Sequence, residues 1–264
     1  MGRRGRKRRK GQAFVTAVGV TAVAAVAFFW AAQASPVGPR REGVGVSAPT
    51  PGRTARAHGP AKAAVSTDIA HASDRGVRGV NITFDDGPDP VWTPRVLKVL
   101  RDNGVKATFC MVGLRARAHP DLVRAVVAAG HRLCDHTVSH DTGIDHKPET
   151  YQSHQVLDAV RMITDASGGV RPMYYRAPGG AFTPYSRRIA AAQGMRPLGW
   201  NVDSKDFKHS GTGVIVATVE REISNGPTVL FHDAGRDRSQ TVAALGEILP
   251  WLRQHGYVFG FPVH

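Results

Sequence analysis

The first quarter of the chain contains almost no acidic side chains. Residues 1–66 hold twelve lysines and arginines but a single acidic residue, Glu42. Residues 67–264 hold the other 23 basic and 20 acidic side chains, so most of the formal charge of +14 lies in the N-terminal segment. A nucleic-acid-binding domain is expected to carry its excess of basic residues on its folded surface. The sequence therefore predicts no nucleic acid partner.

The chain also lacks internal repeats of the kind from which solenoids are built. Its 264 residues are enough for one domain of ordinary size with additional segments. We therefore predict a single globular domain, and we expect it to be a monomer.

Residues 1–34 have the pattern of an export signal. Basic residues between positions 3 and 10 precede an uncharged stretch at 13–34. About 20 apolar helical residues span the hydrocarbon core of a membrane, and basic residues before such a span stay in the cytoplasm. We predict a basic cytoplasmic tail at 1–12. The stretch at 13–34 is either an uncleaved signal anchor or a signal peptide cleaved after Ala34. In both cases the rest of the chain is exported, and it is either anchored on the extracellular face of the membrane or secreted.

Residues 35–75 are rich in Pro, Gly, Ala, Ser and Arg and show no apolar periodicity. This composition is typical of a disordered linker, which could hold a folded domain some tens of ångströms from the membrane. The folded domain is predicted to occupy residues 76–264.

From residue 76 on, short apolar runs alternate with amphipathic stretches. The apolar runs predict seven strands, at 78–84, 106–112, 131–135, 172–176, 195–202, 227–232 and 257–261. The stretches between them predict six helices, at 93–103, 119–129, 150–167, 183–193, 212–224 and 239–254. This alternation is typical of α/β proteins with parallel βα units. The number of units favours a (β/α) barrel, and an open doubly wound sheet is the alternative.

Polar clusters follow five of the predicted strands, each time at the C-terminal end. In a parallel barrel, the loops at this end of the strands carry the chemistry. The clusters are Asp85 and Asp86, His136 and His140, Arg176, Asp203 and Asp206, and His232 and Asp233. We therefore expect these side chains to meet in one site.

Two histidines and a carboxylate in these clusters are suited to bind a metal. His136 and His140 are four residues apart, a spacing that puts two imidazoles on one face of a helical turn. Two His and one carboxylate leave a coordination position of Zn²⁺ open, as in catalytic sites. Adjacent residues on an extended chain point to opposite sides, so one Asp of the Asp85–Asp86 pair can bind the metal while the other acts as a base. Asp85 and His232 are the candidates for the base and the acid that amide or ester hydrolysis requires.

Five motifs, taken in order, resemble those of the NodB-type polysaccharide deacetylases, carbohydrate esterase family 4. They are residues 83–88 (TFDDGP), 136–140 (HTVSH), 176–178 (RAP), 203–207 (DSKDF) and 230–232 (LFH). The resemblance covers about residues 76–264 and implies a distorted (β/α) barrel with an incomplete set of strands.

The resemblance also implies roles for individual side chains. Asp85 would be the catalytic base, oriented by Arg176. His232 would be the general acid, and Asp203 is the carboxylate expected to tune it. Three side chains would bind Zn²⁺ or another divalent ion such as Co²⁺: Asp86, His136 and His140.

Two departures from the family pattern concern the walls of the sugar groove. Gly179 and Gly180 stand where many members have an aromatic residue after the third motif's proline, and Phe207 stands where Trp is usual. A backbone N–H of a glycine can still bind an oxyanion, so the catalytic set is predicted to be complete. The predicted substrate-binding residues are Gly179, Gly180, Trp200, Phe207 and Leu230.

The sequence has only two cysteines, Cys110 and Cys134, on consecutive predicted strands. Export of the chain favours a disulfide, provided that the two Cβ atoms face each other at about 3.5–4.5 Å. Two packed thiols are the alternative. We expect no zinc site on these cysteines, because the histidines and aspartates already supply one.

The resemblance implies a metal-dependent hydrolase that removes acetyl groups from N-acetylated sugars of an extracellular polysaccharide, such as peptidoglycan or a chitin-type polymer. An O-acetyl xylan esterase of the same family is one alternative. A wall-binding or glycan-binding module that keeps the fold but lacks turnover is another. The expected partners are the acetylated polysaccharide and, through the N-terminal segment, the membrane.

Overall fold

The computed structural model describes residues 65–264. The predicted cytoplasmic tail at 1–12, the signal segment at 13–34 and most of the predicted linker lie outside the described residues. Between residues 65 and 264, no helix combines the length and the apolar character that crossing a membrane requires.

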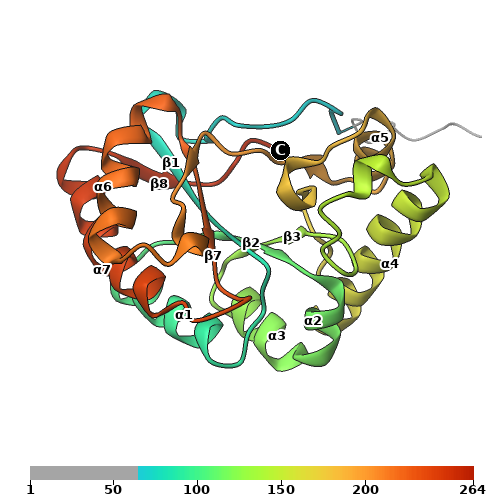
Figure 1. The fold of residues 1–264 in the computed structure, drawn as a ribbon, viewed down its shortest axis with the longest axis horizontal. Coiled ribbons are helices and arrows are strands. Elements are labelled where there is room, and N and C mark those ends of the chain that lie inside the picture. Colours follow the sequence, from blue (N-terminus) through green and yellow to red (C-terminus); the bar gives the residue numbers. More distant parts are fainter. Residues whose placement is uncertain (1–64) are drawn as a thin grey trace, which may run out of the picture. The chain divides into compact units, whose positions relative to one another are not determined.

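The described chain forms one curled parallel sheet, as expected for an α/β protein (Figure 1). Seven strands follow one another in the order β5-β4-β3-β2-β1-β7-β6, and β8 pairs with β1. Each of the seven predicted strand regions contains a strand. The bounds are β1 Gly79–Asp85, β2 Thr108–Met111, β3 Arg132–Asp135, β4 Tyr174–Tyr175, β5 Arg196–Pro197, β6 Val202–Asp203, β7 Thr228–His232 and β8 Val258–Gly260.

Helices cover the outer face of the curled sheet (Figure 1). All six predicted helices are present within about two residues of their predicted ends. The bounds are α1 Trp92–Asp102, α3 Pro120–Ala128, α4 Glu149–Ser167, α5 Pro184–Ala192, α6 Thr212–Glu222 and α7 Ser239–Gln254. Helix α5 begins where the sequence predicts, because Thr183 and Ser186 form a reciprocal capping box. The sequence did not predict α2 (Gly113–Ala118), since six residues are too few to establish a helical period.

The two ends of the sheet are formed by one segment of the chain. The sequence predicts a single strand at 195–202, but β5 pairs with β4 and β6 pairs with β7, with residues 198–201 between them. Between these strands, the carbonyls of Leu198 and Gly199 accept hydrogen bonds from the Arg176 side chain. The sheet forms a curled half-barrel, which is consistent with the predicted distorted barrel.

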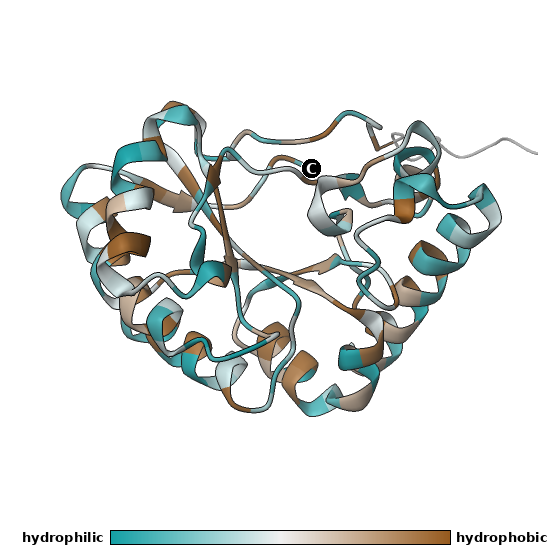
Figure 2. Cartoon of the chain, in the orientation of Figure 1, coloured by the Kyte–Doolittle hydropathy of each residue, from teal (hydrophilic) through white to brown (hydrophobic). Residues whose placement is uncertain are grey.

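Strand β1 separates the hydrophobic core from the interior of the curled sheet. Its seven residues are all buried, and successive side chains point to opposite faces. Phe84 stacks on Phe109 and Phe231, with ring centroids 5.0 and 5.8 Å apart, and the strands beneath the helices are strongly hydrophobic (Figure 2). The alternate positions of β1 carry buried polar side chains: Asn81, Thr83 and Asp85. The last of these residues lies at the C-terminal end of the strand, where the site forms.

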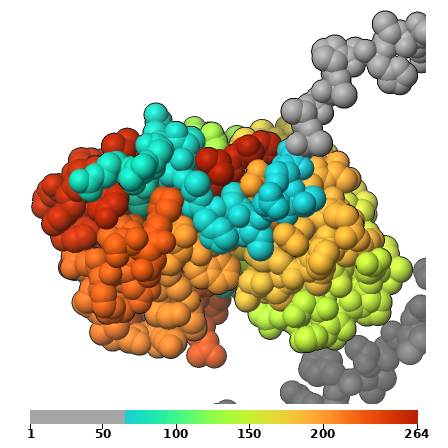
Figure 3. Space-filling model, turned by 90° about the horizontal axis from the view of Figure 1, so that it is seen from above, coloured from blue at the N-terminus to red at the C-terminus, as the bar shows by residue number. Residues whose placement is uncertain are grey.

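Residues 65–75, which we call the strap, precede β1. Composition places them in the disordered linker, but the strap makes main-chain contacts with the domain. Ala70 forms a parallel bridge with Leu198, and Ser73 forms an antiparallel bridge with Pro262. Figure 3 shows the strap (cyan) lying against the C-terminal residues (red) and the yellow-orange part of the chain. The predicted linker boundary at residue 75 is therefore too late, because main-chain pairing leaves no apolar periodicity in the sequence.

Cys110 of β2 and Cys134 of β3 occupy paired positions on neighbouring strands and form a disulfide. Both are buried. The bond links residues 24 positions apart in the chain. Closing a loop of this size restricts the unfolded chain and is expected to stabilise the fold by about 3 kcal/mol.

Loss of the disulfide should lower the stability of the protein. In the variant Cys110→Ala/Cys134→Ala, we expect the free energy of unfolding in urea to fall by about 3 kcal/mol. Dithiothreitol should lower the unfolding midpoint of the wild type and leave that of the variant unchanged. A wild-type midpoint that does not respond to the reductant would contradict the structure.

Candidate active site

The predicted polar clusters converge on one cleft with a volume of about 380 Å³, except that Asp233 does not line it: this carboxylate is buried and accepts a hydrogen bond from the Thr93 hydroxyl. Parallel pairing of β1 with β7 puts Asp85 directly beside His232. The residues that line the cleft come from the ends of several strands: Asp85, Asp86, His140, Thr142, Gly179, Trp200, Asp203, Phe207, Leu230 and His232. His136 and Arg176 are buried and contact Asp85, which lines the cleft.

Asp86, His136 and His140 form the predicted metal-binding triad. One ligand atom from each lies within 4.8 Å of the others. The Nε2 atoms of His140 and His136 are 3.2 and 3.8 Å from Oδ1 of Asp86. Oδ1 of Asp86 is buried without a hydrogen-bond donor, although a buried carboxylate oxygen normally has a partner. A divalent cation bound by these three side chains would supply that partner, so the site fits the predicted ion.

The two histidines converge through a loop and not through a helical turn. Residues 136–140 contain no helix, so the helical spacing argument is wrong even though the pair converges. Thr137 and His140 have φ angles of 67° and 60°, and Asp86 has a φ of 77°. These left-handed conformations are uncommon for residues other than glycine. The Thr137 hydroxyl accepts a hydrogen bond from the His140 backbone N–H at 3.1 Å, which supports the turn.

His136 is held in the orientation that a metal ligand requires. Its Nδ1 lies 2.7 Å from the carbonyl oxygen of Arg176. A carbonyl can only accept, so Nδ1 carries the proton and Nε2 is left free for a metal. Burial lowers the pKa of His136, although Asp85 and Asp86 act in the opposite direction. The neutral imidazole is the form that binds metals.

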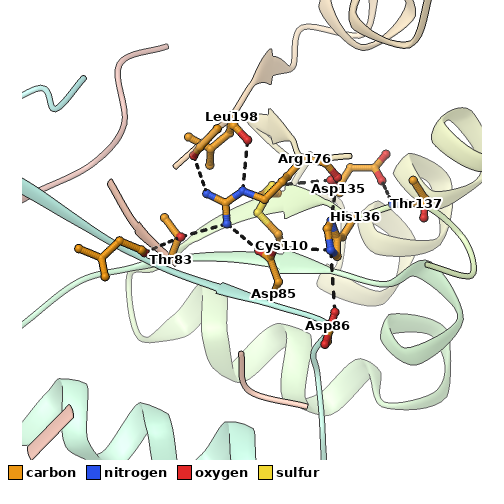
Figure 4. Close-up of a disulfide and its surroundings, with 12 residues drawn as sticks. Thr83, Asp85, Asp86, Cys110, Asp135, His136, Thr137, Arg176 and Leu198 are labelled. Atoms are coloured by element: carbon orange, nitrogen blue, oxygen red, sulfur yellow. Dashed lines mark hydrogen bonds and ion pairs between the residues drawn. A yellow bond between two sulfur atoms is a disulfide. The ribbon is translucent and has the colours of Figure 1, made fainter. Parts of the chain in front are cut away.

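Arg176 is fully buried and holds Asp85 in place through a direct contact (Figure 4). Its Nη1 donates to Oδ1 of Asp85 at 2.6 Å and to the Thr83 hydroxyl at 3.0 Å. Its Nε and Nη2 donate to the carbonyls of Leu198 and Gly199 at 3.2 and 2.9 Å. Burial by itself would raise the pKa of Asp85, but Coulombic interactions with Arg176, His136 and His232 and the Arg176 hydrogen bond together outweigh burial and lower it. Asp85 is therefore an ionised carboxylate in a fixed orientation, as a general base requires.

The family resemblance suggested Asp203 as the partner of His232, but the structure pairs His232 with Asp206. Nδ1 of His232 is 2.7 Å from Oδ1 of Asp206, and the His232 backbone N–H donates to Oδ2 at 2.9 Å. Asp203 pairs with Leu230, two residues before His232 on β7, and its carboxylate accepts hydrogen bonds from Lys205. Asp203 therefore falls short of His232 along the strand, and the following turn brings Asp206 to the histidine.

Asp206 keeps His232 protonated. Burial would lower the pKa of His232, but the hydrogen bond and negative charge of Asp206, with smaller contributions from Asp85 and Asp86, raise it to about 9. The Thr241 hydroxyl donates a further hydrogen bond to Asp206 at 2.9 Å. At neutral pH the cleft thus contains an ionised carboxylate, Asp85, and a protonated imidazole, His232.

Four of the five predicted substrate-binding residues line this cleft: Gly179, Trp200, Phe207 and Leu230. Gly180 lines an adjoining groove, which also contains Gly179 and Trp200. Gly180 has a φ of 74°, and a Cβ atom there would lie 3.1 Å from the Trp200 ring. An aromatic residue would be strained at position 180 and would crowd the Trp200 ring. The glycine that departs from the family pattern therefore leaves room for Trp200.

Comparison with known proteins agrees with the geometry. The family model described as polysaccharide deacetylase matches residues 72–198. A peptidoglycan-N-acetylglucosamine deacetylase of Bacillus cereus is 38% identical over 182 residues, covering 68% of this chain and 84% of the relative. This chain belongs to the polysaccharide deacetylase family. The resemblance inferred from the five motifs is confirmed.

Two further comparisons extend over similar parts of this chain. A chitooligosaccharide deacetylase of Sinorhizobium fredii is 36% identical over 197 residues, covering 70% of this chain and 91% of the relative. The crystal structure of a peptidoglycan N-acetylglucosamine deacetylase in complex with a benzamide compound superposes with a TM-score of 0.69 at 29% identity. That match covers 73% of this chain and 90% of the other.

The pairing of His232 with Asp206 predicts how the histidine titrates. In metal-free Asp206→Asn, the pKa of His232 should fall from about 9 to about 6.5 or below, because the negative charge is lost while burial remains. Asp203→Asn is the matched control and should leave the pKa nearly unchanged. The measurement is an NMR pH titration of the His232 ring. Equal shifts in the two variants would show that the assigned partner is wrong.

Proposed function

We propose that this protein is a metal-dependent hydrolase that removes acetyl groups from N-acetylated sugars of an extracellular polysaccharide, such as peptidoglycan or a chitin-type polymer. The proposal depends above all on the position of Asp85 beside His232, in a cleft that also contains Asp86 and His140. A base and an acid on neighbouring strands can act on one scissile bond. The names of the Bacillus cereus and Sinorhizobium fredii relatives support an N-acetylated glycan as the substrate.

In the proposed reaction, water attacks the acetyl carbon and the bond to the sugar nitrogen breaks. A Zn²⁺ ion, or another divalent ion such as Co²⁺, bound by Asp86, His136 and His140 would polarise the acetyl carbonyl and lower the pKa of water. Asp85 accepts the proton of the attacking water. His232 donates its proton to the sugar nitrogen, so that an amine and acetate are released.

A protonated His232 can supply the acid that an amide substrate requires. An amine is a poor leaving group unless it is protonated as the bond breaks, whereas an alkoxide departs more easily. A histidine with a pKa of about 9 is protonated throughout the neutral range and can supply this proton. Arg176 contributes by keeping Asp85 ionised, so base and acid are in their required states at the same pH.

We also propose that the domain works outside the cytoplasm, either anchored to the membrane or secreted. The basic residues followed by the uncharged stretch at 13–34 support this location. The disulfide between Cys110 and Cys134 agrees with it, because such bonds persist mainly in oxidising compartments.

Substitution of the base and of a metal ligand should affect metal binding differently. Asp85→Asn should retain one bound Zn²⁺ and lose at least about 100-fold in kcat, because the proton acceptor is absent. His136→Ala should lose both metal and activity. The measurements are metal content by mass spectrometry and acetate release at saturating zinc. Since Asn leaves the buried Arg176 without a counter-charge, thermal unfolding of both variants serves as the control. A turnover near wild type in folded Asp85→Asn would refute the assigned base.

Acetate release from a panel of substrates tests the reaction and its alternatives. Metal-stripped and re-metallated protein is assayed on N-acetylglucosamine oligomers, peptidoglycan and acetylated xylan. We expect release only with metal, and a higher kcat/KM on the N-acetylated substrates. A preference for acetylated xylan would make the protein an O-acetyl esterase. No release from any substrate, with metal bound, would make it an inert glycan-binding module.

A further inference from the structure

The strap contacts the segment that closes the sheet between β5 and β6. The Ala70 backbone N–H donates to the Pro197 carbonyl at 2.8 Å, and the Gly199 N–H donates to the Ala70 carbonyl at 3.0 Å. On its other side the strap is fixed by the domain, since the carbonyl of His71 accepts a hydrogen bond from the Thr228 hydroxyl at 2.7 Å. The strap therefore bridges the start of β7 and the segment between β5 and β6.

The same segment supplies two of the acceptors that hold Arg176. The carbonyls of Leu198 and Gly199 accept from the guanidinium group, whose Nη1 donates to Asp85. A continuous series of hydrogen bonds thus runs from Ala70 through Gly199 and Arg176 to Asp85. Residues 198 and 199 are held by two neighbours. The Leu198 N–H donates to the Tyr175 carbonyl of β4, and the Gly199 N–H donates to the Ala70 carbonyl of the strap.

Close packing of the strap against Gly199 makes the contact specific. A Cβ atom at Gly199 would lie 2.3 Å from Nε2 of His71 and 2.9 Å from Cγ2 of Ile69. Real Cβ atoms essentially never approach other atoms this closely, so a side chain at Gly199 would force the His71 and Ile69 side chains or the carbonyl segment to move. Residues 69–71 and Gly199 lie outside the residues that match the family model, 72–198.

We propose that Ala70 of the strap is a positioning residue for the catalytic base and acts through its main chain. Its hydrogen bonds hold the Leu198 and Gly199 carbonyls against Arg176, and Arg176 in turn fixes the carboxylate of Asp85. The proposal rests on the proposed function, because it concerns the alignment of the base in that reaction. It differs from a general role in stability, since displacement of the strap should slow the chemical step while the metal triad, on other loops, stays intact.

Two variants of Ala70 test the proposal in the full-length protein loaded with Zn²⁺. Ala70→Pro removes the N–H that binds the Pro197 carbonyl, whereas Ala70→Gly keeps it and is the matched control. We expect kcat on an N-acetylglucosamine oligomer to fall by about 10- to 100-fold in Ala70→Pro, the size of loss that small misplacements of catalytic groups cause. KM and zinc content should stay near wild type, and Ala70→Gly should retain most of the activity.

The outcomes separate this proposal from the proposed function. If the wild type itself releases no acetate, the proposed function fails. If the wild type is active and the two Ala70 variants have the same kcat, the positioning role is refuted. A rise in KM with an unchanged kcat in Ala70→Pro would also refute it, because the strap would then act only as a wall of the substrate groove.

A second set of variants covers the case in which Ala70→Pro does not fold. Gly199→Ala should lower kcat by about 10-fold or more, because its Cβ meets the side chains of His71 and Ile69. Removing the atoms that it meets, in Gly199→Ala/Ile69→Ala/His71→Ala, should restore a large part of the lost kcat. An equally low kcat in this triple variant would show that the strap is not what constrains Gly199, and would overturn the proposal.

Discussion

The buried positive charge of Arg176 is the constraint on which the rest of the site depends. A guanidinium group removed from water needs an opposite charge and a full set of acceptors, because an unpaired charge in the interior costs several kcal/mol. Asp85 supplies the charge, and the other acceptors are the Thr83 hydroxyl and the carbonyls of Leu198 and Gly199. The Arg176 carbonyl meanwhile binds Nδ1 of His136. One residue thereby fixes both the proposed base and a candidate metal ligand.

Much of the fold could be predicted because its elements are regular and separated by clear signals. The buried strand β1 and the capped helix α5 appear where periodicity and capping residues indicate. The split between β5 and β6 could not be predicted, because it depends on pairing with two different strands, β4 and β7, that lie far apart in the chain. The strap escaped prediction for a similar reason, since its contacts with residues 197–199 are made by the main chain.

The candidate site could be predicted in outline because parallel strands bring their C-terminal ends together. Asp86, His136 and His140 converge as expected, although a loop with left-handed residues brings them together where a helical turn was expected. The choice between Asp203 and Asp206 depends on the register of β6 against β7 and on the turn that follows. A single sequence does not reveal that register. In the structure, Asp203 pairs with Leu230.

The acceptors around Arg176 differ in what a mutation can do to them. Thr83 and Asp85 contribute side-chain oxygens, which a single substitution removes. Leu198 and Gly199 contribute peptide carbonyls, which remain whatever side chain the residue carries. Evolution can therefore vary residue 198 within the limits of packing and keep its contact with the arginine, so homologous chains could share this support without sharing its residues. The orientation of the Asp85 carboxylate therefore depends in part on the path of the main chain at residues 198 and 199.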